Sequence, residues 1–404
     1  MAERLYYEDS YLKEFRAKIL KKIKIDNQPA VVLDETAFYP TSGGQPYDKG
    51  VIQDVPVVEV VEEGDEIIHI LEKELKEKIN SEVVGKIDWK RRFDHMQQHL
   101  GQHILSGALI KLWNAETVSF HLGEEVCTLD IAKEKLTEEE AKKAEECANE
   151  IIFKNRLVKC YFVGGGEDLK RLNLRKVPEK TEKIRIIEVE DFDISACGGT
   201  HCQATGGVGM IKITKWEKRG EKIRLEFICG RRAWKDYFWK NEVIKNISNK
   251  LTIKDSELGE AIDRMLEERK EIGKELKEFK EKLQDYEALD LLHNCAIKKG
   301  NIKVLSKVLE DKTVDEARRL ANKITNLEDC VLLFGIKGER ANLLLARSED
   351  LNYDMNSLIK KACKFIDGRG GGVPNFAQGG GTKVAGIEEA LNFALEHFQE
   401  FVKK

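Results

Sequence analysis

Apolar and polar positions divide the 404-residue chain into four segments with different patterns. In residues 1–90, short runs that alternate between apolar and polar residues are separated by turns with Gly, Asp and Asn. Such alternation is typical of half-buried strands, so we expect a β-barrel-like module here. The predicted strands are Glu14–Leu20, Pro29–Leu33, Val55–Val61, Ile67–Leu71 and Val83–Asp88.

Residues 91–238 mix helical and strand patterns, which predicts an α/β core. Thr137 and Glu140 have the spacing of a capping box, which marks the start of a helix that we expect to reach about Asn155. The other predicted elements are a helix at Asp94–Leu109 and strands at Thr117–Gly123, Val126–Ile131 and Ile184–Val189.

Residues 239–295 carry an apolar stripe with alternating four- and three-residue steps, and mostly Lys and Glu stand between. The stripe consists of Leu258, Ile262, Met265, Ile272, Leu276, Phe279, Leu283 and Tyr286, with Arg269 at the interrupted position. This pattern predicts a coiled-coil linker of about four heptads, which must pack against a partner helix. The partner belongs to the same chain or to a second copy, and the pattern does not choose between them.

Residues 296–404 return to an α/β pattern, with a second capping box at Thr313 and Glu316. The predicted strands are Ile302–Leu305, Cys330–Gly335 and Ala341–Ala346, and the predicted helices are Thr313–Ile324, Met355–Ile366 and Gly386–Val402. The whole chain is therefore predicted to be an α+β multidomain protein.

A glycine-rich segment separates the last two predicted helices. Seven glycines lie between Asp367 and Lys383, together with Arg369. We expect a loop whose free backbone N–H groups face an anion near the start of a helix. A disordered linker is the alternative, and the strongly periodic helices on both flanks disfavour it.

Composition narrows the setting in which the chain works. The 68 Lys and Arg nearly balance the 72 Asp and Glu, so a nucleic-acid surface has to come from local clusters. Nine cysteines without a regular spacing indicate a reducing compartment. No apolar run approaches the roughly 20 residues of a membrane span, so we expect a cytoplasmic protein with no membrane partner.

Two local clusters of positive charge stand out. The first is Leu169–Lys176. The second consists of Lys215, Lys218, Arg219, Lys222, Arg224, Arg231 and Arg232, with Trp216 and Trp234 nearby. A run of charges is usually a solvated face, but a cluster of one sign beside a candidate site favours phosphate contacts.

Four residues have the chemistry and spacing of a metal site. His99 and His103 are four residues apart on the predicted helix, so their rings lie on one face. Cys197 and His201 flank two glycines that allow a tight turn, which can point both at one position. Imidazole and thiolate together suit zinc. His95 lies on the same stripe and is interpreted as supporting or structural.

The same residues resemble a known family. His99-Leu-Gly-Gln-His103 followed by Cys197-Gly-Gly-Thr-His201 resembles the paired motifs of the alanyl-tRNA synthetase editing domain and of the free-standing AlaX editing proteins. The resemblance extends to Phe38–Pro46 upstream. At Gly379–Thr382 it extends to the DHHA1 domain, which ends alanyl-tRNA synthetases and serves nucleic-acid binding.

The resemblance implies an enzyme that removes the wrong amino acid from tRNA(Ala). Its substrate would be Ser-tRNA(Ala), with Gly-tRNA(Ala) as a second, and it would hold one zinc ion per chain. Serine has a hydroxyl that alanine lacks, and a polar pocket group could recognise it. Thr117 and Ser119 are the candidates, and Gln102 is a further candidate catalytic residue. Whether the zinc acts in catalysis or shapes the pocket stays open.

The resemblance also implies contacts with tRNA along the chain. The glycine-rich loop at Gly43 and Gly44 would approach the tRNA end, although a simple turn between strands is the alternative. The other candidate tRNA-binding residues are Arg219, Arg231, Arg232, Arg369, Gly371, Gly380 and Lys383. A homodimer through the coiled coil or the C-terminal domain is a further expectation.

Several functions compete with this hypothesis or are disfavoured. The chain has no Walker-type phosphate loop, and it begins at the barrel rather than with a synthetase domain, so we expect a free-standing protein. It also lacks the Asp-His-His triplet of phosphoesterases. A non-catalytic zinc and RNA-binding module and a nuclease built on the DHHA1-like part are the remaining alternatives.

Overall fold

A computed structural model describes residues 2–402 except 165–171, 173, 176–182 and 300–301. The chain forms two compact units, Met1–Asp255 and Ser256–Lys404, which are described separately. The boundary expected near residue 238 falls inside a helix, α5 (Gly230–Leu251). Within the described residues, no helix is both long and apolar enough to cross a membrane.

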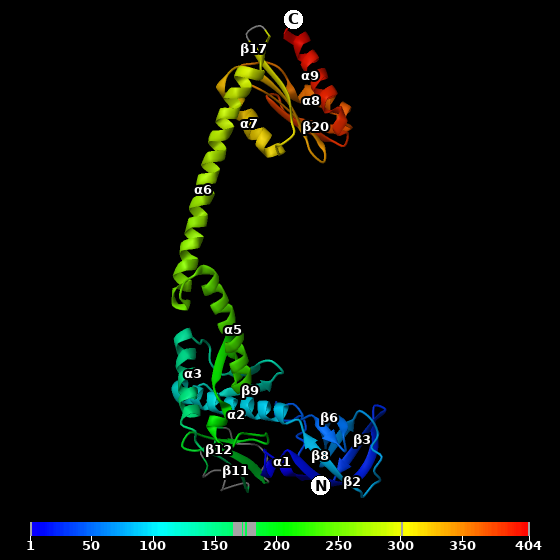
Figure 1. Ribbon diagram of the computed structural model, residues 1–404, viewed down its shortest axis with the longest axis vertical. Coiled ribbons are helices and arrows are strands. Elements are labelled where there is room, and N and C mark those ends of the chain that lie inside the picture. The colour runs from blue at the N-terminus through cyan, green and yellow to red at the C-terminus, as the bar shows by residue number, and fades with distance from the viewer. Residues whose placement is uncertain (1, 165–171, 173, 176–182, 300–301, 403–404) are drawn as a thin grey trace. The chain divides into compact units, whose positions relative to one another are not determined.

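A six-stranded antiparallel barrel opens the first unit (Figure 1). Its strands are β2 (Glu14–Ile25), β3 (Gln28–Leu33), β7 (Glu66–Leu71), β6 (Val55–Glu63), β5 (Gly50–Ile52) and β8 (Glu82–Ile87), in that order around the barrel. Phe15, Ala17 and Ile19 of β2 are buried while the residues between them are exposed, as an inward and outward alternation requires. All five predicted strands coincide with barrel strands, and the short β5 was not predicted.

A buried polar group lies within the barrel. The ring of His69 is fully buried; its Nδ1 lies 3.2 Å from the Val31 carbonyl oxygen and its Nε2 lies 2.8 Å from Thr36 Oγ1. A carbonyl only accepts hydrogen bonds, so Nδ1 carries the proton and Nε2 accepts from the Thr36 hydroxyl. Burial lowers the pKa of His69 to about 4, which keeps the ring neutral.

The central helix of the first unit is α2 (Trp89–Trp113), which packs against a four-stranded sheet. This sheet has the order β14 (Ile211–Arg219), β15 (Lys222–Cys229), β10 (Cys127–Ile131) and β9 (Thr117–Leu122). Met96, Leu100 and Ile104 of α2 are buried in the shared core. The predicted helix and the predicted strand pair are confirmed.

A second, three-stranded sheet and a helix complete the core. The sheet consists of β11 (Val158–Val163), β12 (Ile184–Val189) and β13 (Asp193–Ala196). Helix α3 (Glu138–Phe153) begins with the predicted capping box, in which Thr137 and Glu140 bond each other's backbone. Three short elements precede or follow the first barrel strands, β1 (Glu3–Arg4), α1 (Leu5–Glu8) and β4 (Glu35–Thr36).

A buried ion pair ties α2 to the barrel. Arg92 and Asp48 have fully buried side chains, and Arg92 Nε lies 2.9 Å from an Asp48 carboxylate oxygen. Arg92 also donates to the carbonyl oxygens of Ser10 and Ala37. Breaking a buried pair by removing one partner typically costs about 3–5 kcal/mol, so this contact fixes how α2 begins.

The second unit is a six-stranded sheet with helices on its faces. The sheet order is β16 (Ile297–Lys299), β17 (Ile302–Leu309), β18 (Cys330–Lys337), β19 (Ala341–Arg347), β21 (Phe376–Gly381) and β20 (Gly368–Val373). The helices are α6 (Leu258–Asp290), α7 (Val314–Leu327), α8 (Met355–Ala362) and α9 (Ile387–Val402). The predicted strands and helices of this region are confirmed, including the capping box of α7.

The glycine-rich segment is not the predicted loop. It forms a hairpin, because β20 and β21 pair along their whole length and β21 also pairs with β19. A Cβ at Gly379 would lie 2.2 Å from Cys363 Sγ, and one at Gly381 would lie 2.0 Å from the Ile366 carbonyl oxygen. The glycines are therefore needed because the segment after α8 packs directly on these strands.

The predicted apolar stripe lies on α6. Apart from the half-buried Leu258, its side chains are exposed within the second unit, from 42% at Ile262 to 73% at Tyr286. The C-terminal end is different, because Ala288 of α6 and Leu291 beyond it are buried against the sheet and α7. The stripe is thus a free apolar surface over most of its length in the single chain.

Candidate metal centre and adjoining cavity

The four predicted ligands come together in one cluster. His99 and His103 lie on α2, and Cys197 and His201 lie in the turn after β13. One ligand atom from each residue lies within 4.8 Å of every other. Cys197 Sγ is 3.4 Å from His99 Nε2 and 3.5 Å from His201 Nε2. The cluster can therefore hold a metal ion.

The geometry and the protonation chemistry both fit a cation. In a tetrahedral zinc site, bonds of about 2.3 Å to sulfur and 2.0–2.1 Å to nitrogen place these atoms about 3.5 Å apart. Burial alone would raise the pKa of the Cys197 thiol, but the electrostatic interaction with the three neighbouring histidines outweighs it and holds the pKa well below its usual value. Burial lowers the pKa of His201 to about 3. Thiolate and neutral imidazole are the forms that bind metal.

A turn from the barrel orients His99. Gln45 is fully buried, and its Oε1 accepts hydrogen bonds from His99 Nδ1 at 2.7 Å and from Thr200 N at 3.2 Å. Its Nε2 donates to Thr200 Oγ1 at 2.9 Å. With Nδ1 protonated, His99 turns Nε2 toward Cys197. Gln45 therefore connects both halves of the cluster.

The turn that carries Gln45 depends on two glycines. Ser42 and Gln45 exchange both backbone hydrogen bonds, while Gly43 and Gly44 have φ of 55° and 84°. Positive φ at both central positions defines a two-residue hairpin turn that favours glycine. The Gly44 carbonyl oxygen also accepts from Leu122 N at 2.9 Å. Gly43 and Gly44 therefore form a simple tight turn, as one alternative proposed, and this turn also belongs to the site.

His103 has a charged environment. Its Nδ1 lies 2.9 Å from Arg175 Nη2 and 3.7 Å from Asp193 Oδ2, and its Nε2 has no hydrogen-bond partner within the described structure. Arg175 Nε is 2.6 Å from Asp193 Oδ1. Burial alone would lower the pKa of His103, but Cys197 and Asp193 outweigh burial and raise it. Arg175 can only donate, so its contact with Nδ1 leaves the proton of the neutral ring on Nε2. A cation at Nε2 would require this proton to move to Nδ1 and Arg175 Nη2 to move away from it.

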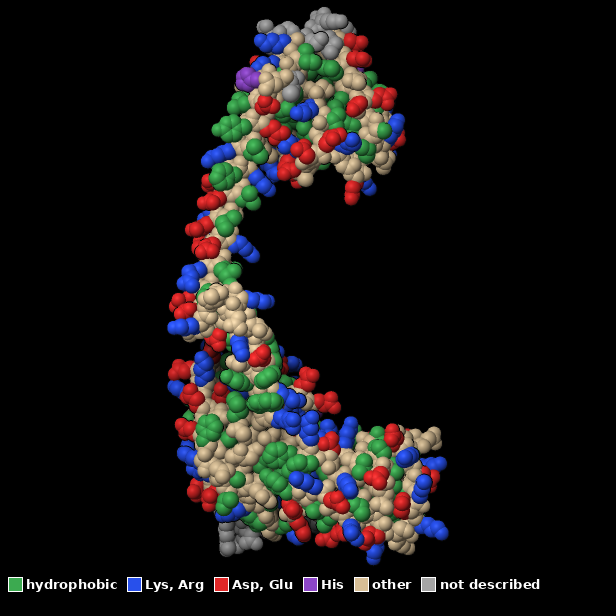
Figure 2. Space-filling view, in the orientation of Figure 1, with side chains coloured by type: hydrophobic (Ala, Val, Ile, Leu, Met, Phe, Trp, Pro, Cys, Tyr) green, Lys and Arg blue, Asp and Glu red, His purple; other side chains and the backbone are tan. Residues whose placement is uncertain are grey.

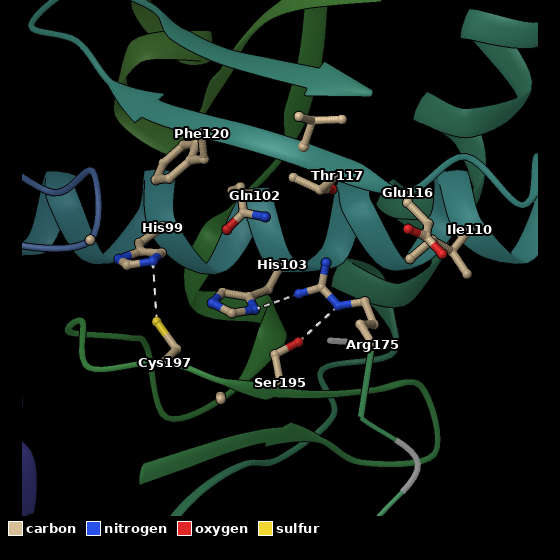
Figure 3. Close-up of a pocket in the computed structure, with 13 residues that line it drawn as sticks. His99, Gln102, His103, Ile110, Glu116, Thr117, Phe120, Arg175, Ser195 and Cys197 are labelled. Atoms are coloured by element: carbon tan, nitrogen blue, oxygen red, sulfur yellow. Dashed lines mark hydrogen bonds between the residues drawn. The ribbon is translucent and has the colours of Figure 1, made fainter. Parts of the chain in front are cut away.

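A cavity of about 460 Å³ opens beside the cluster. Figure 3 shows His99, Gln102 and His103 of α2 among the residues that line it, with Cys197, which also lines it, joined to His99 by a dashed line. Phe120 and Thr117 of β9 form a further wall, and Arg175, Ser195, Glu116 and Gly43 also line the cavity. The cavity therefore joins the candidate metal ligands to hydroxyl, carboxylate and guanidinium groups.

The three predicted catalytic residues have different positions. Thr117 and Gln102 line the cavity and are connected through Ser106, whose Oγ lies 2.6 Å from Thr117 Oγ1 and 2.8 Å from Gln102 Nε2. Ser119 is not among the residues that line it. Its hydroxyl is exposed and donates to Asp130 on the neighbouring strand at 3.0 Å. The structure thus brings two of the three into the site.

Sequence reasoning missed the supporting residues Gln45, Ser106, Arg175 and Asp193. Each of them contacts a residue that is distant in sequence or on the other side of a turn. No regular sequence spacing links Gln45 to His99 or Asp193 to His103. Gln45 lies within the Phe38–Pro46 motif, and the turn glycines before it are the one sequence feature that points to it.

The predicted tRNA-binding residues of the first unit are spread out. Gly43 lines the cavity, whereas Arg219 is exposed at the end of β14 and pairs with Glu217 at 2.6 Å. Arg231 is exposed at the start of α5. Arg232 is held inside the unit, because its guanidinium pairs with Asp94 at 2.7 Å and donates to the Gly123 carbonyl oxygen.

The second positive cluster is less one-sided than its sequence indicates. Lys215 lies near Glu217 and Glu226, and Arg224 is paired with Asp130 at 2.7 Å. Carboxylates on the paired strands therefore offset part of this charge, and the expected phosphate contacts stay a prediction. Most of the first cluster, Leu169–Lys176, lies outside the described residues.

The predicted tRNA-binding residues of the second unit lie on the glycine hairpin. Arg369, Gly371 and Gly380 line an open cavity of about 420 Å³, together with Asn342 of β19 and Val314 at the start of α7. Lys383 is exposed and follows the hairpin. The strand backbones are paired, so the free N–H groups expected here are not available between β20 and β21.

Comparison with known proteins gives matches in three parts of the chain. The family described as "Threonyl and Alanyl tRNA synthetase second additional domain" matches residues 184–225. "tRNA synthetases class II (A)" matches residues 3–91, and "DHHA1 domain" matches residues 301–404.

A full-length relative decides the family. The alanyl-tRNA editing protein AlaX-L of Pyrococcus horikoshii is 32% identical over 414 residues, covering 100% of both chains. The chain belongs to the family of alanyl-tRNA editing proteins. The alanine–tRNA ligase of Pyrococcus furiosus is 35% identical over 96% of the chain, which spans 42% of that ligase. The chain is thus similar in sequence to part of a larger protein.

One solved structure is similar to a smaller part of the chain. The C-Ala domain of Aquifex aeolicus alanyl-tRNA synthetase covers 27% of this chain and 98% of its own, with 23% sequence identity and a TM-score of 0.24.

Proposed function

We propose that this protein hydrolyses the aminoacyl ester of mischarged tRNA(Ala), with Ser-tRNA(Ala) as substrate and Gly-tRNA(Ala) as a second. The observation that carries the proposal is the cluster of His99, His103, Cys197 and His201 beside a cavity, in a chain related over its full length to an alanyl-tRNA editing protein. Alanine–tRNA ligases that contain a similar region support tRNA(Ala) as the partner.

The donor set supports zinc as the ion, one per chain. Three nitrogens and a thiolate match zinc, whereas calcium or magnesium would require oxygen ligands. Bound zinc would polarise the ester or a water molecule beside it. Four protein ligands complete a tetrahedral site, so turnover at the metal needs one ligand to give way, and otherwise the ion shapes the pocket.

The chain's own groups would select and orient the substrate. Gln102 donates to Ser106, whose hydroxyl can then donate to Thr117 and leave the Thr117 hydroxyl free to donate into the cavity. This hydroxyl is the group that would bind the serine side chain. A site that hydrogen-bonds a substrate hydroxyl rejects the analogue without it, so alanine is spared. Glu116 on the cavity wall would attract the substrate's ammonium group.

The C-terminal unit would hold the body of the tRNA, and a second copy of the chain would cover the stripe on α6. Arg369, Gly371, Gly380 and Lys383 provide an exposed surface with cationic side chains and a floor of bare backbone. Lys and Arg that contact phosphates release counterions, so this binding should weaken as salt rises.

The test incubates the protein with Ser-tRNA(Ala) and with Ala-tRNA(Ala) and follows both the released amino acid and the length of the RNA. We expect serine to be released much faster than alanine, with the tRNA intact. Alanine at His103 or Cys197 should lower zinc content and serine release together. Shortened tRNA would show a nuclease, and release at the spontaneous rate would show a non-catalytic zinc and RNA-binding module.

A further inference from the structure

A second cavity of about 390 Å³ lies beside the first turns of α2. Two elements lie between it and the metal cavity and contribute residues to both: the turn around Gly43–Pro46 and helix α2. Gly43 lines the metal cavity and Pro46 lines the second one, while on α2 His99 lines the first and His95 the second. Four residues of helix rise about 6 Å, so the two cavities are neighbours along α2.

The second cavity has an excess of positive side chains. Its cationic residues are Lys49, Lys90, Arg91, Arg232 and Lys235, and its acidic residues are Asp88, Asp94 and Glu124. Figure 2 shows Lys and Arg side chains gathered near the start of α2, where it meets the barrel.

Part of this charge is already used within the protein. Asp94 is paired with Arg232 at 2.7 Å, and Asp88 caps α2 by accepting from Arg91 N at 3.2 Å. Among the residues that the structure describes, Lys49, Lys90 and Lys235 form no ion pair. Glu124 is the remaining acidic residue, against three free lysines.

An unpartnered buried group also lines the cavity. His95 is only 3% exposed, and its Nδ1 has no hydrogen-bond partner in the described part of the chain. A buried polar atom without a partner is costly, so it points to a missing acceptor or donor. A phosphate oxygen entering the cavity would be a suitable acceptor for a ring N–H.

An exposed aromatic face continues from the cavity along α5. Trp234 is 57% exposed and Phe238 is 55% exposed, and their ring centroids are 5.8 Å apart. Lys235 lies one turn before Phe238 and Trp239, so it shares their side of the helix. Cationic groups that track a backbone, with aromatic rings for bases, are the features of single-stranded nucleic-acid binding.

We propose that this cavity and the adjoining face of α5 bind the single-stranded 3′ end of the tRNA. Lys49, Lys90 and Lys235 contact backbone phosphates, and Trp234 with Phe238 stacks on a base. The proposal rests on the proposed function, because the aminoacyl ester in the metal cavity places the next nucleotides within reach. The three lysines without ion pairs lie beside exposed aromatic rings, and this arrangement matches the alternating phosphates and bases of a single strand. An acidic peptide could bind the lysines, but it would have no bases to stack on the rings.

The experiment measures binding of an uncharged RNA oligonucleotide with the 3′-terminal sequence of tRNA(Ala) to the full chain at several salt concentrations. The variant K49Q/K90Q/K235Q should bind more weakly, and its log–log salt slope should be shallower by about 2, since each lost single-strand phosphate contact contributes about 0.7. The matched control, K18Q/K24Q/K76Q, removes three exposed barrel lysines outside the cavity and should retain more of the wild-type slope. Zinc content and thermal stability should match the wild type in both.

The aromatic half has its own variant. W234A/F238A should weaken binding by about tenfold while leaving the salt slope unchanged, because stacking releases no counterions. An unchanged slope in the cavity variant, or an equal loss in the barrel control, would overturn the proposal. So would a W234A/F238A protein that changes its oligomeric state but not its RNA affinity, since the face would then bind protein.

The test separates this proposal from the proposed function. Uncharged RNA is not hydrolysed, so wild-type binding with the expected slopes but no serine release would reject only the enzyme. Hydrolysis of a small seryl ester, combined with no effect of the lysine variant on RNA binding, would reject only the cavity.

Discussion

Replacing Gln45 by leucine tests whether the barrel controls the metal site. Leucine is similar in size and cannot accept the hydrogen bonds from His99 Nδ1 and Thr200 N, which are 2.7 and 3.2 Å long. Two buried donors therefore lose their acceptor, and Thr200 Oγ1 loses the donor Gln45 Nε2. At about 1–3 kcal/mol for each unsatisfied buried group, unfolding should require about 2–6 kcal/mol less free energy.

The same substitution should weaken metal binding. Loss of a partner that orients a ligating histidine typically costs about 10–100-fold in metal affinity. Gln45→Glu should keep most of the affinity, because a carboxylate still accepts from both donors. Gln203→Leu is the matched control, since its side chain is exposed two residues after His201.

The assay is zinc competition with a chelator of known affinity, combined with urea unfolding of the metal-free proteins. We expect Gln45→Leu to lose affinity and stability, Gln45→Glu to keep affinity, and Gln203→Leu to match the wild type. Zinc affinity within twofold of wild type in Gln45→Leu would refute the reasoning that this side chain orients His99. Equal losses in the leucine and glutamate variants would show that the site needs the amide itself.

Three further predictions concern the barrel, the glycine hairpin and α6. The pKa of His69 is about 4 in the folded state and near 6.5 when unfolded, so the unfolded state binds more protons between these values. About 3 kcal/mol of stability should therefore be lost as pH falls from 6.5 through 4. Urea unfolding should show this loss in the wild type and not in His69→Gln. Gly379→Ala should lower the thermal stability of the C-terminal unit, while Gly380→Ala, whose Cβ would lie 3.2 Å from a side-chain oxygen, should be milder; equal calorimetric effects would contradict the packing argument. Leu276→Lys should reduce self-association in sedimentation experiments, and Lys277→Glu, off the stripe, should not; a wild-type monomer at high concentration would reject a dimer through α6.

Local sequence patterns predicted most of the helices and strands, because the interactions that start or end them involve residues only a few positions apart. The capping boxes at Thr137 and Thr313 depend on a partner three residues away, and the histidine pair depends on the helical repeat. The glycine-rich segment was predicted to be an anion-binding loop, but it is a hairpin. A glycine-rich sequence is compatible with both structures. Contacts such as that of Cys363 with Gly379 distinguish them, and these contacts are tertiary.

The residues that support the metal ligands could not be predicted either, because their contacts are also tertiary. Gln45 and Thr200 are 155 residues apart, and nothing in either local pattern indicates the contact. Ser119 was a candidate because its hydroxyl could recognise that of serine, but in the structure this hydroxyl donates to Asp130. The pairing of β9 and β10 shifts register next to Asp130, which a simple alternation cannot anticipate.

The segment from Ser42 to Asp48, in which Gln45 and Asp48 are buried, has a consequence for how the protein is made on the ribosome. The turn and the barrel that holds it emerge first, followed by α2 with His99 and His103, whereas Cys197 follows His99 by 98 residues. At about 5–20 residues per second, that interval is about 5–20 s of synthesis. During this time the nascent chain offers His99, which Gln45 contacts, and His103, but not yet Cys197 or His201. Metal capture by all four ligands must therefore wait for the Cys197 turn, and a ribosome that stalls before it leaves a chain with half a site.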